Sequence, residues 1–102
     1  MVYVAKLVTN GTQAQLTQAW MRAEKFDSLI DDPDFLGLKP GNTTYILYST
    51  EQAALALIAR EQADPNVAAF LESAEVTTLE SEGLEPDEFF DVQTIVTLSH
   101  SF

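Results

Sequence analysis

The chain has 102 residues, of which 46% are hydrophobic, and its 16 acidic and 5 basic side chains give a formal net charge of −11 at pH 7. This length fits a single domain covering residues 1–102, with a hydrophobic core of ordinary size. The charge argues against nucleic acid and membranes as partners, because both require a basic surface. The sequence contains no cysteine, which excludes disulfides, thiolate metal sites and cysteine nucleophiles.

No apolar run approaches the roughly 20 residues of a membrane span, and no secretory leader pattern opens the sequence. We therefore expect a cytoplasmic protein. The excess of acids is interpreted as a solvated surface that favours solubility. A cationic partner is the alternative interpretation.

Residues 2–9 are rich in β-branched side chains and predict the first strand. An antiparallel strand with one solvated face should alternate apolar and polar residues. Here both faces are apolar, and only Lys6 interrupts one of them. We expect either a central strand covered on both sides or a face that meets a partner subunit. The residues on one face are Tyr3, Ala5 and Leu7, and those on the other are Val2, Val4 and Val8.

A long amphipathic helix is predicted next. Thr12 and Gln15 have the spacing of a capping box after the turn residues Asn10-Gly11. Asp32-Pro33 ends the helix, because a residue before proline is driven out of the helical region. The apolar face recurs at steps of three and four residues and consists of Leu16, Ala19, Trp20, Ala23, Phe26 and Ile30.

A hairpin follows, in which the turn Pro40-Gly41-Asn42 joins the apolar residues 35–39 to a strand at 43–48. Residues 49–52 form a second capping box before the alanine-rich helix at 53–59. Asp64-Pro65 begins a further helix, since proline suits a first helical turn. That helix directs Val67, Phe70 and Leu71 towards the core.

Two interpretations stay open at residues 75–82, which fit a strand or the end of the preceding helix. The acids between Glu80 and Asp91 are interrupted by Gly83 and Pro86 and predict an exposed loop, whose role the sequence does not give. Residues 91–99 predict a closing strand, with Val92, Val96 and Leu98 in phase on one face.

The order strand, helix, hairpin, helix, strand is βαββαβ, a ferredoxin-like α+β fold with helices on one face of an antiparallel sheet. Residues 32–38 (DPDFLGL) resemble the entry to the second strand in the dimeric α/β-barrel superfamily. Residues 43–53 are similar to its third strand and the step into the helix, and residues 64–71 to its broken second helix. Antibiotic-biosynthesis-type monooxygenases are members of this superfamily.

The resemblance implies a homodimer packed through open sheet faces, and a pocket between sheet and helices in each subunit. It also implies a cofactor-free monooxygenase that deprotonates a small aromatic or polyketide-like molecule for direct reaction with O₂. A non-catalytic binding or assembly module of the same fold is the alternative. The haem-degrading branch fits poorly, because Tyr48 stands on the third strand where that branch has tryptophan, and Asn10 lies beyond the first strand.

The candidate pocket residues are aromatic, with tyrosine hydroxyls able to orient a flat ligand; packing in the core is the competing interpretation. They are Tyr3, Trp20, Tyr45 and Tyr48. The weak catalytic candidate is His100, the only histidine, which could carry a proton near neutral pH or be a surface residue near the chain end. We expect no metal, because the acids lack the spacing of a calcium loop. Neither the substrate nor the existence of a reaction follows from these residues.

Overall fold

The computed structural model describes residues 2–10 and 23–99 and contains a four-stranded sheet. Its strands lie in the order β2-β3-β1-β4, and all neighbours are antiparallel. The prediction of an α+β fold with an antiparallel sheet is confirmed. The strands are β1 (Tyr3–Thr9), β2 (Phe35–Lys39), β3 (Thr43–Tyr48) and β4 (Leu71–Thr77).

The sheet interleaves two pairs of parallel strands. Because β3 is antiparallel to both β1 and β2, these two run in the same direction with β3 between them. By the same reasoning β3 and β4 are parallel, with β1 between them. Strand β1 is therefore central, which explains why its sequence is apolar on both faces.

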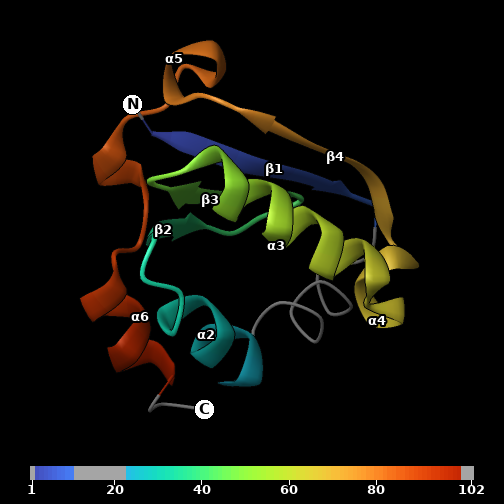
Figure 1. Cartoon of the computed structure of the whole chain (residues 1–102), viewed down its shortest axis with the longest axis horizontal. Helices are drawn as coiled ribbons and strands as arrows, with labels where there is room; N and C mark the ends of the chain where they lie inside the picture. Colours follow the sequence, from blue (N-terminus) through green and yellow to red (C-terminus); the bar gives the residue numbers. More distant parts are fainter. Residues whose placement is uncertain (1, 11–22, 100–102) are drawn as a thin grey trace.

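In the described part of the chain, four helices lie on one side of the sheet or beside it (Figure 1). The longest of these four, α3, packs on β1, β3 and β4, while α2 packs against α6 near β2. Within the described residues, no helix has the length and hydropathy needed to cross a bilayer. The four helices are α2 (Ala23–Ile30), α3 (Glu51–Ala63), α4 (Pro65–Ala68) and α6 (Val92–Ser99).

The predicted helix starts at α3 and α4 are correct to within a residue or two, but α3 is capped by Thr50 and not by the capping box predicted at 49–52. The Thr50 side chain accepts a hydrogen bond from the Ala53 amide at 3.2 Å, and Asp64 accepts one from the Asn66 amide at 2.9 Å. The N-terminal part of the long predicted first helix, including Trp20, lies outside the described residues.

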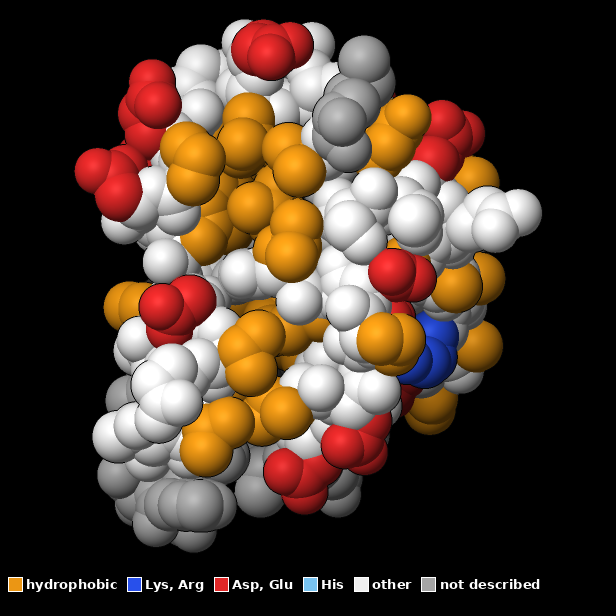
Figure 2. Space-filling view, turned by 60° about the vertical axis from the view of Figure 1, so that its left-hand side comes forward, with side chains coloured by type: hydrophobic (Ala, Val, Ile, Leu, Met, Phe, Trp, Pro, Cys, Tyr) orange, Lys and Arg blue, Asp and Glu red, His pale blue; other side chains and the backbone are white. Residues whose placement is uncertain are grey.

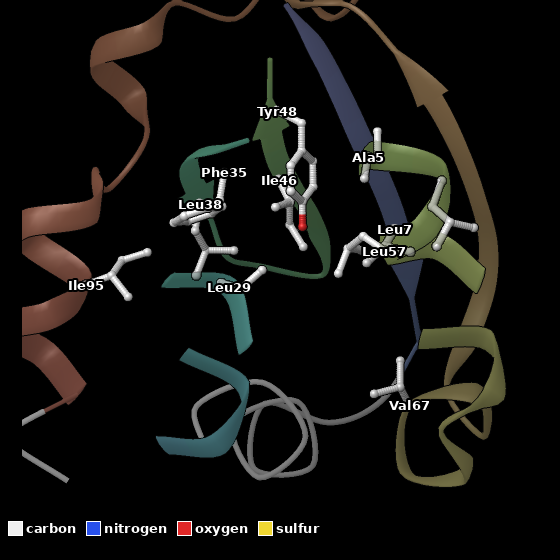
Figure 3. Close-up of a cluster of buried hydrophobic side chains, with 12 residues drawn as sticks. Ala5, Leu7, Leu29, Phe35, Leu38, Ile46, Tyr48, Leu57, Val67 and Ile95 are labelled. Carbon is white, nitrogen blue, oxygen red and sulfur yellow. The ribbon is translucent and has the colours of Figure 1, made fainter. Parts of the chain in front are cut away.

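The main core fills the space between the sheet and these helices, and Figure 3 shows its side chains converging from both. It contains Ala5 and Leu7 from one of the two predicted faces of β1, together with residues from β2, β3 and the four helices. The buried members are Ala5, Leu7, Leu29, Phe35, Leu38, Ile46, Tyr48, Ala54, Leu57, Ile58, Val67 and Ile95.

The predicted closing strand at 91–99 is wrong, because these residues form the helix α6. The Asp91 carboxylate accepts a hydrogen bond from the Thr94 amide at 2.8 Å, which caps the first turn. The Thr97 hydroxyl donates to the Gln93 carbonyl at 3.1 Å, as a threonine within a helix can. Ile95 is fully buried in the main core, so tertiary packing overrides the β-branched composition.

The last strand is β4, which settles the ambiguity at residues 75–82. It continues to Thr77, and the short helix α5 (Leu79–Glu82) begins two residues later. Leu71, expected on a helix, is the first residue of the strand. β4 lies at the edge of the sheet and therefore needs few apolar residues. Among its apolar residues, Ala74 and Val76 pack against the main core.

Residues 78–90, here called the cover segment, lie over the sheet face opposite α3. They contain α5 and the 3₁₀ turn Pro86–Glu88, and so place short helical elements on the second face as well. A second apolar cluster forms where Leu79, Leu84 and Phe89 pack around Val4 and Leu47. The prediction of an exposed loop between Glu80 and Asp91 is therefore wrong for the backbone, which forms helical turns and packs on the sheet through the apolar residues between the acids. Most of the carboxylates themselves are exposed, as expected.

This arrangement changes the interpretation of the second face of β1. Val4, expected to be exposed on an open face unless a partner subunit covered it, is 0% exposed within the single chain. Val8 on the same face is only half-buried. The cover segment therefore takes the place of a partner over one half of this face.

Candidate functional site

Three aromatic side chains form a row across one end of the sheet, on the side that faces the helices. Tyr48 of β3 is paired in register with Tyr3 of β1 and with Phe35 of β2. The rings of Phe35 and Tyr48 meet edge to face, with centroids 6.1 Å apart and an interplanar angle of 68°. All three belong to the main core or pack against it. This row offers the flat apolar contacts that an aromatic ligand would use.

The Tyr48 hydroxyl is a buried polar group inside this row. The residue is 0% exposed, and its ring points from β3 into the cluster of side chains in Figure 3. Within the described residues the hydroxyl oxygen has no hydrogen-bond partner. An unsatisfied buried group costs about 1–3 kcal/mol, so a native protein that keeps one requires an explanation.

Burial raises the pKa of the Tyr48 hydroxyl far above its ordinary range, because the phenolate would lose its hydration. The Arg60 guanidinium opposes this shift, but the two groups do not meet the geometry of a hydrogen bond. The carboxylates of Asp32 and Glu61 reinforce the rise in pKa. At neutral pH the hydroxyl is therefore protonated and can donate a hydrogen bond, but it cannot accept a proton as a base.

A second polar group of side chains lies on the opposite face of the sheet and holds the cover segment in place. The Lys6 ammonium lies 2.9 Å from Glu82 Oε1. The Tyr45 hydroxyl donates to the same oxygen at 3.3 Å, and the Thr77 hydroxyl donates to Glu82 Oε2 at 3.2 Å. Glu75 lies 4.0 Å from the Lys6 ammonium.

The hydrogen bond and ion pair with Lys6 lower the pKa of Glu82, and Glu82 in turn raises the pKa of Lys6. Both groups are charged at neutral pH and satisfied by one another. Burial, followed by the nearby Glu82 charge, raises the pKa of Tyr45. We interpret this group as a structural attachment of the cover segment, because its members bind one another.

The structure separates the candidates that the sequence grouped together. Tyr3 and Tyr48 lie side by side on the helix-facing side of the sheet. Tyr45 packs in the second cluster on the other side, so it cannot line the same pocket. Trp20 and His100 lie outside the described residues.

Sequence reasoning missed the charged neighbours of Tyr48. Glu61 is only 2% exposed and stands on the buried face of α3. A signal for it exists, since Glu61 follows Ala54, Leu57 and Ile58 at helical spacing and so puts an acid on an apolar face. Asp32 was interpreted only as a helix-end residue.

The described residues contain no group of three or more histidine, aspartate or glutamate side chains arranged to hold a metal ion. On the helix-facing side, the described residues offer aromatic rings for apolar contact and one neutral hydroxyl as a hydrogen-bond donor. A few charged side chains lie near this hydroxyl. Comparisons with models of protein families, with curated protein sequences and with solved structures found no match to this chain.

Proposed function

We propose that this chain binds a small, flat organic molecule between its sheet and its helices, with the Tyr48 hydroxyl donating a hydrogen bond to an oxygen of that molecule. The observation that supports this proposal is the buried Tyr48 hydroxyl, which has no hydrogen-bond partner within the described residues and belongs to a residue flanked in the sheet by Tyr3 and Phe35. A ligand oxygen would satisfy the donor, and the rings would supply apolar contact. The ligand class is therefore an aromatic ketone, phenol or phenolate.

The proposed architecture is ferredoxin-like, of the dimeric α/β-barrel kind. The interleaving of β1 and β2 around β3, and of β3 and β4 around β1, supports it, because a split βαβ arrangement separates the strands of each unit in this way. Residues 78–99, which follow the fourth strand, are an addition to that pattern.

The proposed reaction is cofactor-independent monooxygenation of an aromatic or polyketide-like substrate. A substrate CH₂ group conjugated to a carbonyl would lose one proton to water, and a neutral buried donor such as Tyr48 would stabilise the negative charge that develops on the carbonyl oxygen. The substrate would supply the electrons that reduce O₂: one oxygen atom becomes a new carbonyl oxygen, and the other leaves as water with the two hydrogens of the CH₂ group. The surrounding rings would exclude water. A non-catalytic binding or assembly module is the second candidate. It is favoured by the raised pKa of Tyr48, which prevents this residue from taking the substrate proton.

Titration calorimetry with 1-naphthol and a hydroxylated anthracenone tests the binding proposal. We expect Tyr48→Phe to weaken binding at least tenfold and Tyr45→Phe, a matched control on the other sheet face, to leave it unchanged. Equal affinities in all three proteins, or no binding by the wild type, would contradict the proposal. Oxygen uptake with the anthracenone separates the two candidates, since only the enzyme consumes O₂ in a manner that depends on Tyr48.

We also propose a homodimer, as the family resemblance implies. Its contact would use the part of the outer sheet face that the cover segment leaves free, around Val8, Thr43 and Ser73, of which the first two are half-buried and the third exposed. Light scattering should then give twice the chain mass of 11.3 kDa, and Val8→Asp should reduce it to one chain. A wild-type mass of one chain would contradict the dimer without affecting the ligand proposal.

A further inference from the structure

One edge of the sheet carries an unusual concentration of exposed apolar side chains. Four large hydrophobic residues are exposed in the described part of the chain, and three of them belong to two segments that meet at this edge: Leu36 (41% exposed), Phe90 (43%) and Val92 (38%). Single exposed apolar residues are common on proteins, but a group of them marks an interaction surface. We call these three residues the edge patch. Figure 2 brings this side forward and shows hydrophobic side chains gathered on it.

The edge patch is held by regular backbone contacts. Leu38 of β2 and Phe90 exchange two backbone hydrogen bonds, of 3.0 and 2.8 Å, in an antiparallel bridge. Leu36 lies two residues before this bridge on one segment and Val92 two residues after it on the other. Asp91 caps α6 between Phe90 and Val92. The apolar side chains are thus presented by fixed backbone, as a docking surface requires.

The edge patch is bordered mainly by carboxylates, and the nearby base on β2 is Lys39, whose ammonium lies 5.9 Å from the centre of the Tyr45 ring. Residues 61–99 contain no lysine or arginine. Exposed carboxylates precede and interrupt the patch in the sequence, at Glu85, Asp87, Glu88 and Asp91. Figure 2 shows acidic side chains bordering the hydrophobic ones, with basic side chains at one margin only.

The exposed apolar residues and the carboxylates around them together indicate which kind of partner can bind the edge patch. A second copy of the chain in a two-fold contact would bring the same carboxylates face to face, and like charges oppose such a contact. Nucleic acids and anionic lipids are repelled for the same reason. A partner with apolar side chains flanked by lysine or arginine would match both the patch and its border.

We propose that the edge patch is a docking surface for a basic amphipathic segment of a partner protein. The apolar residues of that segment pack on Leu36, Phe90 and Val92, and its cations face the carboxylates of residues 85–91. This surface lies outside the proposed ligand site, so the two proposals stand or fall separately.

Fluorescence anisotropy with a labelled lysine–leucine peptide of helical amphipathic spacing tests this proposal. Its controls are a glutamate–leucine peptide of the same pattern and a lysine–leucine peptide with the leucines scattered. We expect the first peptide alone to bind appreciably, with an affinity that falls as salt rises. Phe90→Ser and Leu36→Ser should each weaken it about tenfold, as the loss of a buried apolar anchor does. Both variants are checked for folding by circular dichroism.

Two matched controls exist within the chain. Leu55→Ser on α3 removes a leucine that is 50% exposed away from the edge patch, and should leave peptide affinity unchanged. Neutralising Asp87 and Glu88 together should weaken binding, whereas Glu72→Gln on β4 should not. Equal weakening by Leu55→Ser, equal binding of the scattered peptide, or a chain dimer that Phe90→Ser dissociates would each overturn the proposal.

Discussion

Replacing Tyr48 by phenylalanine should stabilise the ligand-free protein. The substitution keeps the ring that packs against Phe35 and removes only a hydroxyl that is buried and unpartnered within the described residues. Most substitutions in a core destabilise it, so a gain in stability is an unusual and informative outcome. The gain comes from the desolvation of the hydroxyl, which the folded wild type bears and the variant avoids.

The expected size of this effect follows from the same cost. Leaving a buried hydroxyl unsatisfied costs about 1–3 kcal/mol, and we expect at least about 1 kcal/mol to be recovered. For a domain of this length that corresponds to a rise in melting temperature of about 4–8 °C. The urea midpoint should rise by about 0.3–1 M at an unchanged slope.

Tyr45→Phe is the matched control, and it should lower the free energy of unfolding where Tyr48→Phe raises it. Its hydroxyl donates to Glu82 at 3.3 Å, so removing it should cost about 0.5–1.5 kcal/mol. Urea unfolding of the wild type and the two variants, followed by circular dichroism, measures both changes. A loss of about 1 kcal/mol or more in Tyr48→Phe would refute the reasoning, because it would mean that the hydroxyl already has a partner and is not free for a ligand.

Four further substitutions test the cover segment and the sheet face beneath it. Gly37→Ala should cost about 1–3 kcal/mol in urea unfolding, because a Cβ there would lie 2.9 Å from Phe89 Cβ; an unchanged midpoint would mean that Phe89 moves aside freely. Glu82 has a lowered pKa, so its contribution to stability is present above its ordinary value of 4.5 and is lost as the pH falls through the lower folded-state pKa. Glu82→Gln should therefore flatten the dependence of the melting temperature on pH below about 4.5, and the same slope in the variant would contradict this. Val4→Asp should lower the free energy of unfolding by several kcal/mol, because it buries an unpaired charge. Val8→Asp, on the half-buried part of the same face, should cost less, and its melting temperature should fall only by what the loss of the proposed dimer accounts for.

Local sequence signals predict correctly those elements in which the signals agree with the packing. β1 and β3 combine β-branched composition with apolar faces, and both are central strands. Thr50 and Asp64 satisfy the first amides of α3 and α4, an interaction between neighbours in the chain that needs no tertiary contact. Tyr3 and Tyr48 were identified as candidates from their residue type and strand position, and they lie next to each other in the sheet.

The conformation of the last third of the chain and the membership of the site depend on contacts between elements that are distant in sequence. β4 has few apolar residues because an edge strand is covered on one side only, whereas residues 91–99 have strand-like composition but are held as a helix by the Asp91 cap and the burial of Ile95. Tyr45 and Tyr48 are three residues apart on a predicted strand, so the alternation of side chains already places them on opposite faces. Which of these faces the helices cover depends on the tertiary structure. The burial of the Tyr48 hydroxyl and of Glu61 depends on elements distant in sequence that pack around them, and periodicity along the chain does not encode those contacts.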